Sequence, residues 1–363
     1  MLKDGYQYAL MLYGAGEAPL GQVVVAVDWE PAREWAEFSA IRRGLLSADE
    51  AGRVCTVQPL WHPTLGEPYL QGFRISVRTN ETIETATDFT KAYFRPLAKQ
   101  AASLLMKKGI LKKGERFKFL AAAFPRQEKA QETPKFSFTT EEVTPGLTIR
   151  EASLAAFVGD SATHGNVDAV DMPLFVPQRI LEEAKGLSKA AGAKETGGIL
   201  IGHLLRDASA REVFAEVTAQ IPARHAEAEL TKLKFTPQTW TDVRAALELR
   251  RRDEIMLGWW HSHPVREWCK GCSKESQQAC TMAVDFFSAH DHALHRTVFP
   301  RAYSIALVVN DLAGELATFS LFGWRRGLLE SRGFNVTGEA VQQQKETQGS
   351  AGVVSLDAVL SEC

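Results

Sequence analysis

The chain has 363 residues, a length that suggests two domains or one large domain with additions. Its composition, 45% hydrophobic and 24% charged, is that of an ordinary globular protein with a substantial core. The 42 Lys and Arg residues balance 44 Asp and Glu residues, which argues against a nucleic-acid or anionic-membrane binder. No apolar run reaches the roughly 18 residues that span a bilayer, and no secretory signal is expected. We therefore expect a cytoplasmic protein whose five cysteines are reduced.

Residues 1–125 predict a small α+β domain with several apolar strands and one long helix. This region has no metal constellation, phosphate loop or nucleophile paired with a base. We expect it to recognise substrate or a partner protein, the alternative being simple support of the rest of the chain. The predicted strands are 22–29, 54–60, 70–77 and 117–124, and the predicted helix is 83–106, kinked or divided at Pro96.

A polar, Pro-marked linker and lead-in segment is predicted over 126–171, and a second domain over 172–327. Residues 328–363 are expected to form a largely disordered tail. Helices alternate with strands in the second domain, which predicts an α/β sandwich. Three helices are expected: one begins at Pro177, one begins at Thr236-Pro237 and one spans 282–296. The expected strands are 197–205, 213–221, 255–263, 303–309 and 316–322.

The strand predicted over 255–263 ends in His261-Ser262-His263. Alternate side chains of a strand share a face, so both imidazoles continue one apolar stripe. Two imidazoles in this arrangement can bind one metal ion together, although such a pair alone is more often two ordinary surface histidines.

A second segment, Ser288-Ala289-His290-Asp291, supplies what the histidines lack. Positions three apart on a helix face the same way, so Asp291 offers a carboxylate ligand with the Ser288 hydroxyl beside it. Two His and one Asp leave a fourth position open, as expected of a catalytic zinc. The candidate base is Glu195, at the head of the buried strand GGILIG, where an acid without a function would be costly.

Glu195 with GGILIG, then His-Ser-His-Pro, then Ser-x-x-Asp resembles the JAB/MPN (JAMM) metalloprotease family over residues 172–325. The resemblance implies a cytidine-deaminase-like α/β sandwich that follows the small α+β domain. It also implies a zinc-dependent isopeptidase that removes ubiquitin or a ubiquitin-like protein from conjugates or precursors. One setting would be a bacterial ubiquitin-like conjugation system, with activating and conjugating enzymes of the same pathway as partners.

The roles that follow are a hypothesis for this chain. His261, His263 and Asp291 bind Zn²⁺, which activates a water molecule. Glu195 takes the proton of that water and returns it to the departing lysine amine. Ser288 donates a hydrogen bond to the oxyanion. No nucleophilic cysteine is needed.

The sequence departs from the family in the 24 residues between His263 and Ser288, far more than the family has there. The insert, 265–287, contains Cys269, Cys272 and Cys280, whose Cys-x-x-Cys pair is a half-site for a second, structural zinc. The fourth ligand stays open between His292 and His295, and reduced loop thiols or a redox dithiol are alternatives.

Two other functions are alternatives, and the first of them uses the same site. The first is a peptidase that processes a sulfur-carrier or small precursor protein. It differs from an isopeptidase in whether the scissile bond joins a C-terminal Gly to a lysine side chain. The second is a non-catalytic MPN scaffold, which is disfavoured because all three ligands and the base are present.

Overall fold

A computed structural model describes residues 2–48, 53–78, 84–126, 147–225, 227–228, 233–280 and 286–338. The fold is mixed α/β, with its strands arranged in a seven-stranded sheet, a ten-stranded sheet and a two-stranded ribbon. Among the described helices, none has the length and apolarity needed to cross a membrane.

The first sheet contains the N-terminal strands, in the order β1-β4-β5-β7-β2-β3 with β6 also paired to β5. A helix, α1 (Glu30–Arg42), packs on β5 and β6, and α2 (Arg95–Lys107) contacts β2 and β3. The strands are β1 (Leu2–Asp4), β2 (Tyr6–Tyr13), β3 (Pro19–Val25), β4 (Val54–His62), β5 (Gly66–Arg78), β6 (Glu84–Thr90) and β7 (Lys118–Pro125), with short 3-10 turns η1 (Ala15–Glu17) and η2 (Lys91–Phe94).

The predicted helix 83–106 is wrong in its first half, because Glu84–Thr90 forms β6. Thr85 and Phe89 are buried at alternate positions, and the Phe89 ring stacks on Phe73 of β5 at 4.8 Å. The β-branched and aromatic residues therefore pair as a strand. Pro96 occupies the first turn of α2, so it begins this helix where a kink was expected.

The ten-stranded sheet has the order β18-β17-β16-β15-β11-β12-β10-β19-β9, with β8 paired to β11. The central antiparallel strands β11, β12 and β15 were predicted from their apolar runs and are confirmed. Its strands are β8 (Ile149–Glu151), β9 (Ser161–His164), β10 (Leu174–Pro177), β11 (Gly197–Asp207), β12 (Glu212–Pro222), β15 (Ile255–His263), β16 (Ile305–Asp311), β17 (Ala317–Arg325), β18 (Leu328–Arg332) and β19 (Phe334–Thr337), and the ribbon joins β13 (Glu227–Ala228) to β14 (Leu233–Lys234).

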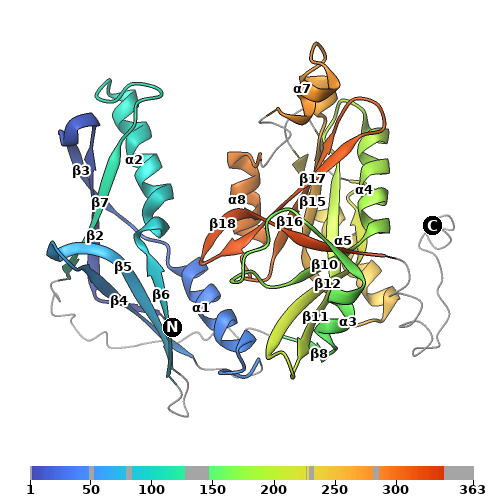
Figure 1. Ribbon diagram of the computed structural model, residues 1–363, viewed down its shortest axis with the longest axis horizontal. Helices are drawn as coiled ribbons and strands as arrows, with labels where there is room; N and C mark the ends of the chain where they lie inside the picture. The colour runs from blue at the N-terminus through green and yellow to red at the C-terminus, as the bar shows by residue number, and fades with distance from the viewer. Residues whose placement is uncertain are drawn as a thin grey trace. The chain divides into compact units, whose positions relative to one another are not determined.

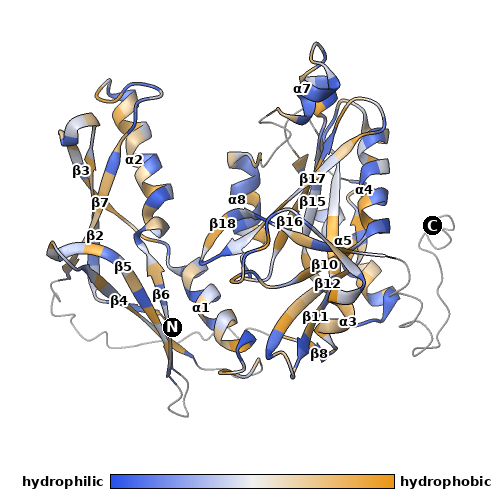
Figure 2. Ribbon diagram, in the orientation of Figure 1, coloured by the Kyte–Doolittle hydropathy of each residue, from blue (hydrophilic) through white to orange (hydrophobic). Residues whose placement is uncertain are grey.

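Helix α4 packs along β10, β11, β12 and β15, as the ribbon view shows (Figure 1). Hydropathy colouring marks α7 as hydrophilic along its length, in keeping with its sequence KESQQ (Figure 2). The helices of this part of the chain are α3 (Leu154–Gly159), α4 (Gln178–Ala191), α5 (Pro237–Arg250), α6 (Val265–Trp268), α7 (Lys274–Gln278) and α8 (Ala289–Val298).

The compact units differ from the domains that we expected. Unit 1 comprises Met1–Ile149, Phe287–Ile305 and Phe322–Glu330, and unit 2 comprises Arg150–Phe286, Ala306–Leu321 and Ser331–Cys363. The N-terminal region thus shares a unit with α8, which a boundary at residue 125 or 172 would separate from it. Long-range packing of this kind leaves no local signal in a sequence.

Two segments that we expected to be linker or tail contain regular structure. Within the predicted linker and lead-in, residues 147–164 form β8, α3 and β9, and Phe157 of α3 packs with Phe175, Leu205 and Phe214. The predicted tail is wrong over 328–337, which form β18 and β19. Residues 165–171 of the predicted lead-in are described and lie in no helix or strand, whereas residues 127–146 and 339–363 lie outside the described residues.

Asp207 connects the end of β11 to the start of α3. Its Oδ2 accepts the Leu154 backbone N–H at 2.7 Å, and its Oδ1 accepts the Ser209 N–H and hydroxyl at 2.8 and 2.5 Å and the Ala210 N–H at 3.0 Å. These donors, the Ser209 hydroxyl first, lower the pKa of Asp207 to about 2. The folded protein therefore stabilises the ionised form of the Asp207 side chain.

We expect Asp207→Asn to lower the melting temperature at neutral pH. We also expect the melting temperature of this variant to fall less than that of the wild type as pH is lowered. Because the folded pKa is depressed, the stabilisation is present above the ordinary pKa of 3.8 and is lost as pH falls through about 2. Thermal unfolding measured between pH 2 and 7 tests this. The exposed Asp253, with 82% of its side chain accessible, gives a matched Asn control that should change little.

Candidate metal centre

The two histidines are positioned by the pairing of β15 with β11. The strands run antiparallel, with Gly197 opposite His261 and Gly198 opposite Trp260. A Cβ at Gly197 would lie 2.3 Å from the Trp260 carbonyl oxygen, and one at Gly198 would lie 2.4 Å from the Ile221 carbonyl oxygen. Only glycine lets the neighbouring backbones approach this closely, so Gly197 sets the distance of β11 from β15 and Gly198 its distance from β12.

Both imidazoles are buried and converge. His261 and His263 are 0% and 1% exposed, and their Nε2 atoms lie 3.1 Å apart. The His261 ring stacks on Trp259 with centroids 4.6 Å apart, and Trp268 and Phe286 lie at 5.1 and 5.4 Å from the His263 ring. The strand alternation that we predicted is confirmed, but the histidines belong to the interior and not to an exposed strand end.

Ser288 and Asp291 form a reciprocal cap at the start of α8. The Asp291 N–H donates to Ser288 Oγ at 3.1 Å, and the Ser288 N–H donates to Asp291 Oδ2 at 2.8 Å. The predicted helix 282–296 is wrong over 286–288, because Ser288 is the N-cap and the described helix begins at Ala289. Residues 281–285 lie outside the described part of the chain.

His261, His263 and Asp291 are brought together as one group. One ligand atom from each lies within 4.8 Å of the others, and Asp291 is 5% exposed. Among the described residues this is the one group of three or more His, Cys, Asp or Glu that could share an ion. Two imidazoles and a carboxylate are a donor set that zinc accepts, so the residues fit the metal that we expected.

Glu195 lies where the pairing of β11 and β15 continues past the strand. The Thr196 N–H donates to Ser262 Oγ at 2.9 Å, and the Ser262 N–H donates to the Thr196 carbonyl at 2.8 Å. These two bonds extend the register of Gly197 with His261 by one residue, to Thr196 and Ser262. Glu195 is 4% exposed. Glu195 does not join the group of three close ligand atoms among the described residues, so its role as the base stays a prediction.

The cysteines of the insert lie close together. Cys269 Sγ and Cys280 Sγ are 3.8 Å apart, and the Cys272 N–H donates to the Cys269 carbonyl at 2.9 Å. Burial, followed by Cys280 and Cys272, raises the pKa of the Cys269 thiol to about 11. A metal would have to displace a proton there, so binding would strengthen as pH rises.

Neither histidine proposed as the fourth ligand joins the cysteines in a group of close ligand atoms among the described residues. His295 is buried, with Phe299 and Trp324 rings 5.9 and 5.5 Å away. That burial lowers the pKa of His295 to about 3. The His292 ring contacts Phe287 at 5.1 Å. The second zinc stays a prediction.

We expect purified protein to contain more than one zinc per chain, and Cys269→Ser with Cys272→Ser to reduce that count by about one. Elemental analysis after removal of loosely bound metal measures it. Cys55→Ser is the matched control, since Cys55 is buried in β4 and its thiol donates to Glu37 at 3.2 Å. A wild-type count of one zinc would contradict the second site.

Comparisons with known proteins add little. No family model and no curated protein matches the sequence. One solved structure that matches is the solution structure of protein DSY2949 from Desulfitobacterium hafniense, a structural genomics target. It is 18% identical, the match covers 46% of this chain and 94% of that chain, and the TM-score is 0.30.

Proposed function

We propose that this chain is a zinc-dependent isopeptidase of the JAB/MPN type that removes ubiquitin or a ubiquitin-like protein from conjugates or precursors. The observation that carries the proposal is the buried pair of imidazoles, with Nε2 atoms 3.1 Å apart, grouped with the Asp291 carboxylate. Two buried imidazoles and a buried acid are costly in a protein interior unless they have polar partners, and one shared metal ion would be a partner for all three.

The pairing of β11 and β15 supports the JAB/MPN fold as part of the same proposal. The GGILIG strand and the His-Ser-His strand are neighbours, and their glycines are needed at the contact. Glu195 and the histidines thus come from adjacent strands, in the order that the resemblance implies.

His261, His263 and Asp291 would hold the metal, and zinc bound there would act as a Lewis acid that lowers the pKa of a water towards about 7. Glu195 is the group that accepts the proton of the attacking water on its carboxylate and delivers it to the departing amine. Its 4% exposure keeps bulk water from competing for that proton.

Ser288 can act as a hydrogen-bond donor because its acceptor role is already filled. Its Oγ accepts the Asp291 N–H at 3.1 Å, which leaves the hydroxyl hydrogen to point elsewhere. That hydrogen can stabilise negative charge on the carbonyl oxygen under attack. The same cap holds one oxygen of Asp291 and so restricts the orientation of its carboxylate.

The experiment uses the full chain, loaded with zinc, and a set of ubiquitin-like proteins joined through a C-terminal Gly to the lysine side chain of one reporter peptide. A matched set joins the same proteins to the same peptide through an ordinary peptide bond. We expect cleavage after the Gly of isopeptide-linked substrates, its loss with a zinc chelator and its return with added zinc. Thiol alkylation should spare the chemistry, since no cysteine is a nucleophile.

Cleavage of the linear set alone would contradict isopeptidase activity and favour the peptidase that trims precursors. Zinc-loaded protein that cleaves neither set would contradict a hydrolase and favour a binding scaffold.

A further inference from the structure

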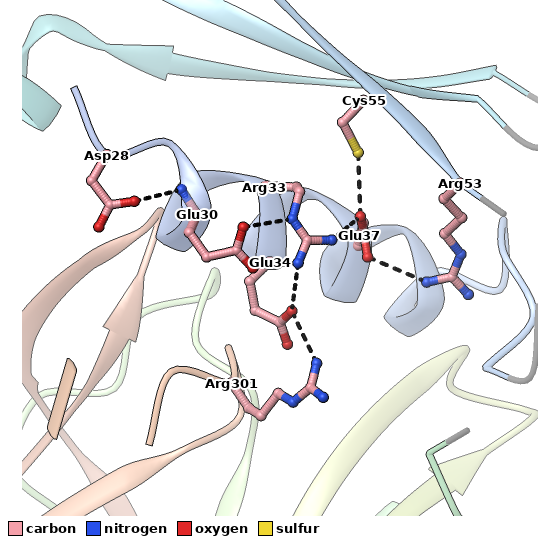
Figure 3. A network of polar contacts seen from close by, with 8 residues as sticks. All are labelled: Asp28, Glu30, Arg33, Glu34, Glu37, Arg53, Cys55 and Arg301. Carbon is pink, nitrogen blue, oxygen red and sulfur yellow. Dashed lines mark hydrogen bonds and ion pairs between the residues drawn. The ribbon is translucent and has the colours of Figure 1, made fainter. Parts of the chain in front are cut away.

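A network of ionised side chains follows one side of α1 in unit 1 (Figure 3). Arg33 pairs with Glu37 at 2.5 Å and approaches Glu34 at 3.9 Å. Glu37 also meets Arg53 at 3.5 Å and accepts the Cys55 thiol. The network links this surface of α1 to Cys55 of β4 and to Arg53 just before that strand.

Two acidic residues at this surface contact the α8 segment, by which we mean residues 287–305. Glu34 pairs with Arg301, with 3.4 Å between Arg301 Nη1 and Glu34 Oε2, and accepts the Ala302 N–H. Burial raises the pKa of Glu34 while Arg301 opposes that shift, so the arginine helps to keep the carboxylate ionised. On α8 itself, Arg296 pairs with Asp28, just before α1.

Apolar packing accompanies these ion pairs. Phe38 of α1 and Tyr303 after α8 lie with ring centroids 5.8 Å apart. The turn between β17 and β18 fits closely against α1, because a Cβ at Gly327 would lie 2.9 Å from Ala32 N and 2.9 Å from Tyr93 Cε2. Gly327 also has φ +70°, so glycine is required there for two reasons.

The same turn leads to residues that hold α8. Trp324 of β17 donates from Nε1 to the Phe299 carbonyl at 2.9 Å, and its ring packs on His295. At the start of α8, Phe287 stacks on Phe322 with centroids 4.4 Å apart. α8 is thus held at both ends by β17, and β17 ends in the turn that α1 contacts.

We propose that α1 is a positioning element for α8, so that the N-terminal region sets the metal affinity of the site through Asp291. The inference rests on the proposed function in taking Asp291 as a ligand. Metal–ligand distances are tolerated only within about 0.2 Å, so a small displacement of α8 should weaken binding. Helix α1 would then act on the metal site whether or not the N-terminal region recognises substrate.

Two glycines give a matched test in the full chain. Gly327→Ala adds a methyl group against the backbone of α1, whereas Gly314→Ala at φ +71° meets only the end of Lys274, at 3.7 Å. Both carry the same left-handed strain, so the contact with α1 is what differs. Zinc affinity is measured by competition with a chelator, and ligand geometry by the visible absorption of bound Co²⁺.

We expect Gly327→Ala to lower zinc affinity at least tenfold and to alter the Co²⁺ spectrum, and Gly314→Ala to stay within about twofold of wild type. Equal behaviour of the two variants would overturn the positioning role. Wild-type protein that binds no zinc at His261, His263 and Asp291 would instead overturn the proposed function, which separates the two failures.

If Gly327→Ala does not fold, Arg301→Gln tests the same positioning of α8 by α1. We expect about a threefold loss of zinc affinity, with Glu34→Gln and the double variant losing no more, because both remove one interaction. The control is Arg325→Gln, whose partner Glu330 lies at 3.7 Å within β17 and β18. Unchanged affinity in Arg301→Gln, or equal loss in the control, would contradict the proposal.

Discussion

Glu195→Gln should keep zinc in the main site and lose at least about 100-fold in turnover, since general-base assistance contributes about 10²–10⁴. The amide has nearly the shape of the carboxylate, so the fold and the ligands should be unaffected, but it cannot accept a proton at neutral pH. Steady-state hydrolysis of the isopeptide substrate and the zinc content of the same sample are the two measurements.

Glu183→Gln is the control for loss of a carboxylate, since Glu183 lies on α4 with 45% of its side chain accessible. It should retain full turnover. Near wild-type activity in Glu195→Gln would contradict the mechanism, and loss of zinc together with activity would mean that Glu195 supports the metal instead of moving a proton.

His261→Ala should lose both the metal and the activity. Loss of an outer partner of a metal ligand costs about 10–100-fold in affinity, and loss of a ligand should cost more. Chelator competition measures the affinity, and added zinc should not restore turnover at concentrations that saturate the wild-type chain.

His203→Ala is the matched histidine control on β11. Its Nε2 lies 2.9 Å from the Arg252 carbonyl, away from the ligand group, so zinc affinity and turnover should be unchanged. Full activity of His261→Ala would remove the histidine pair from the mechanism.

Short-range patterns carried most of the predictions that the structure confirms. The alternation in 255–263 gave β15 and the shared face of its histidines. The apolar run after Glu195 gave β11. Patterns failed where two interpretations compete locally, as in Glu84–Thr90, where polar threonines obscure a strand whose Phe89 is buried against β5.

The local structure around the candidate site residues was predicted only in part. Ser-x-x-Asp was interpreted as two positions on one helix face, whereas it is the reciprocal cap that begins α8. The Ser/Asp spacing alone is a helix-start signal, and it could have placed the boundary. The burial of both imidazoles depends on aromatic neighbours such as Trp268 and Phe286, whose positions no local pattern indicates.

The association of α1 with the α8 segment could not be predicted. Glu34 and Arg301 are 267 residues apart, and each alone has the sequence context of an ordinary charged surface residue. The boundary that we expected near residue 125 followed composition, which reports linkers but not which segments pack together.

The central claim is that one metal ion is bound by His261, His263 and Asp291. Anomalous scattering from crystals of the zinc-loaded chain, collected on both sides of the zinc absorption edge, tests it most directly. The account predicts a peak at about 2.0–2.2 Å from one nitrogen of each imidazole and one carboxylate oxygen. A zinc-loaded crystal with no peak at these three residues, or with its zinc elsewhere, would contradict it.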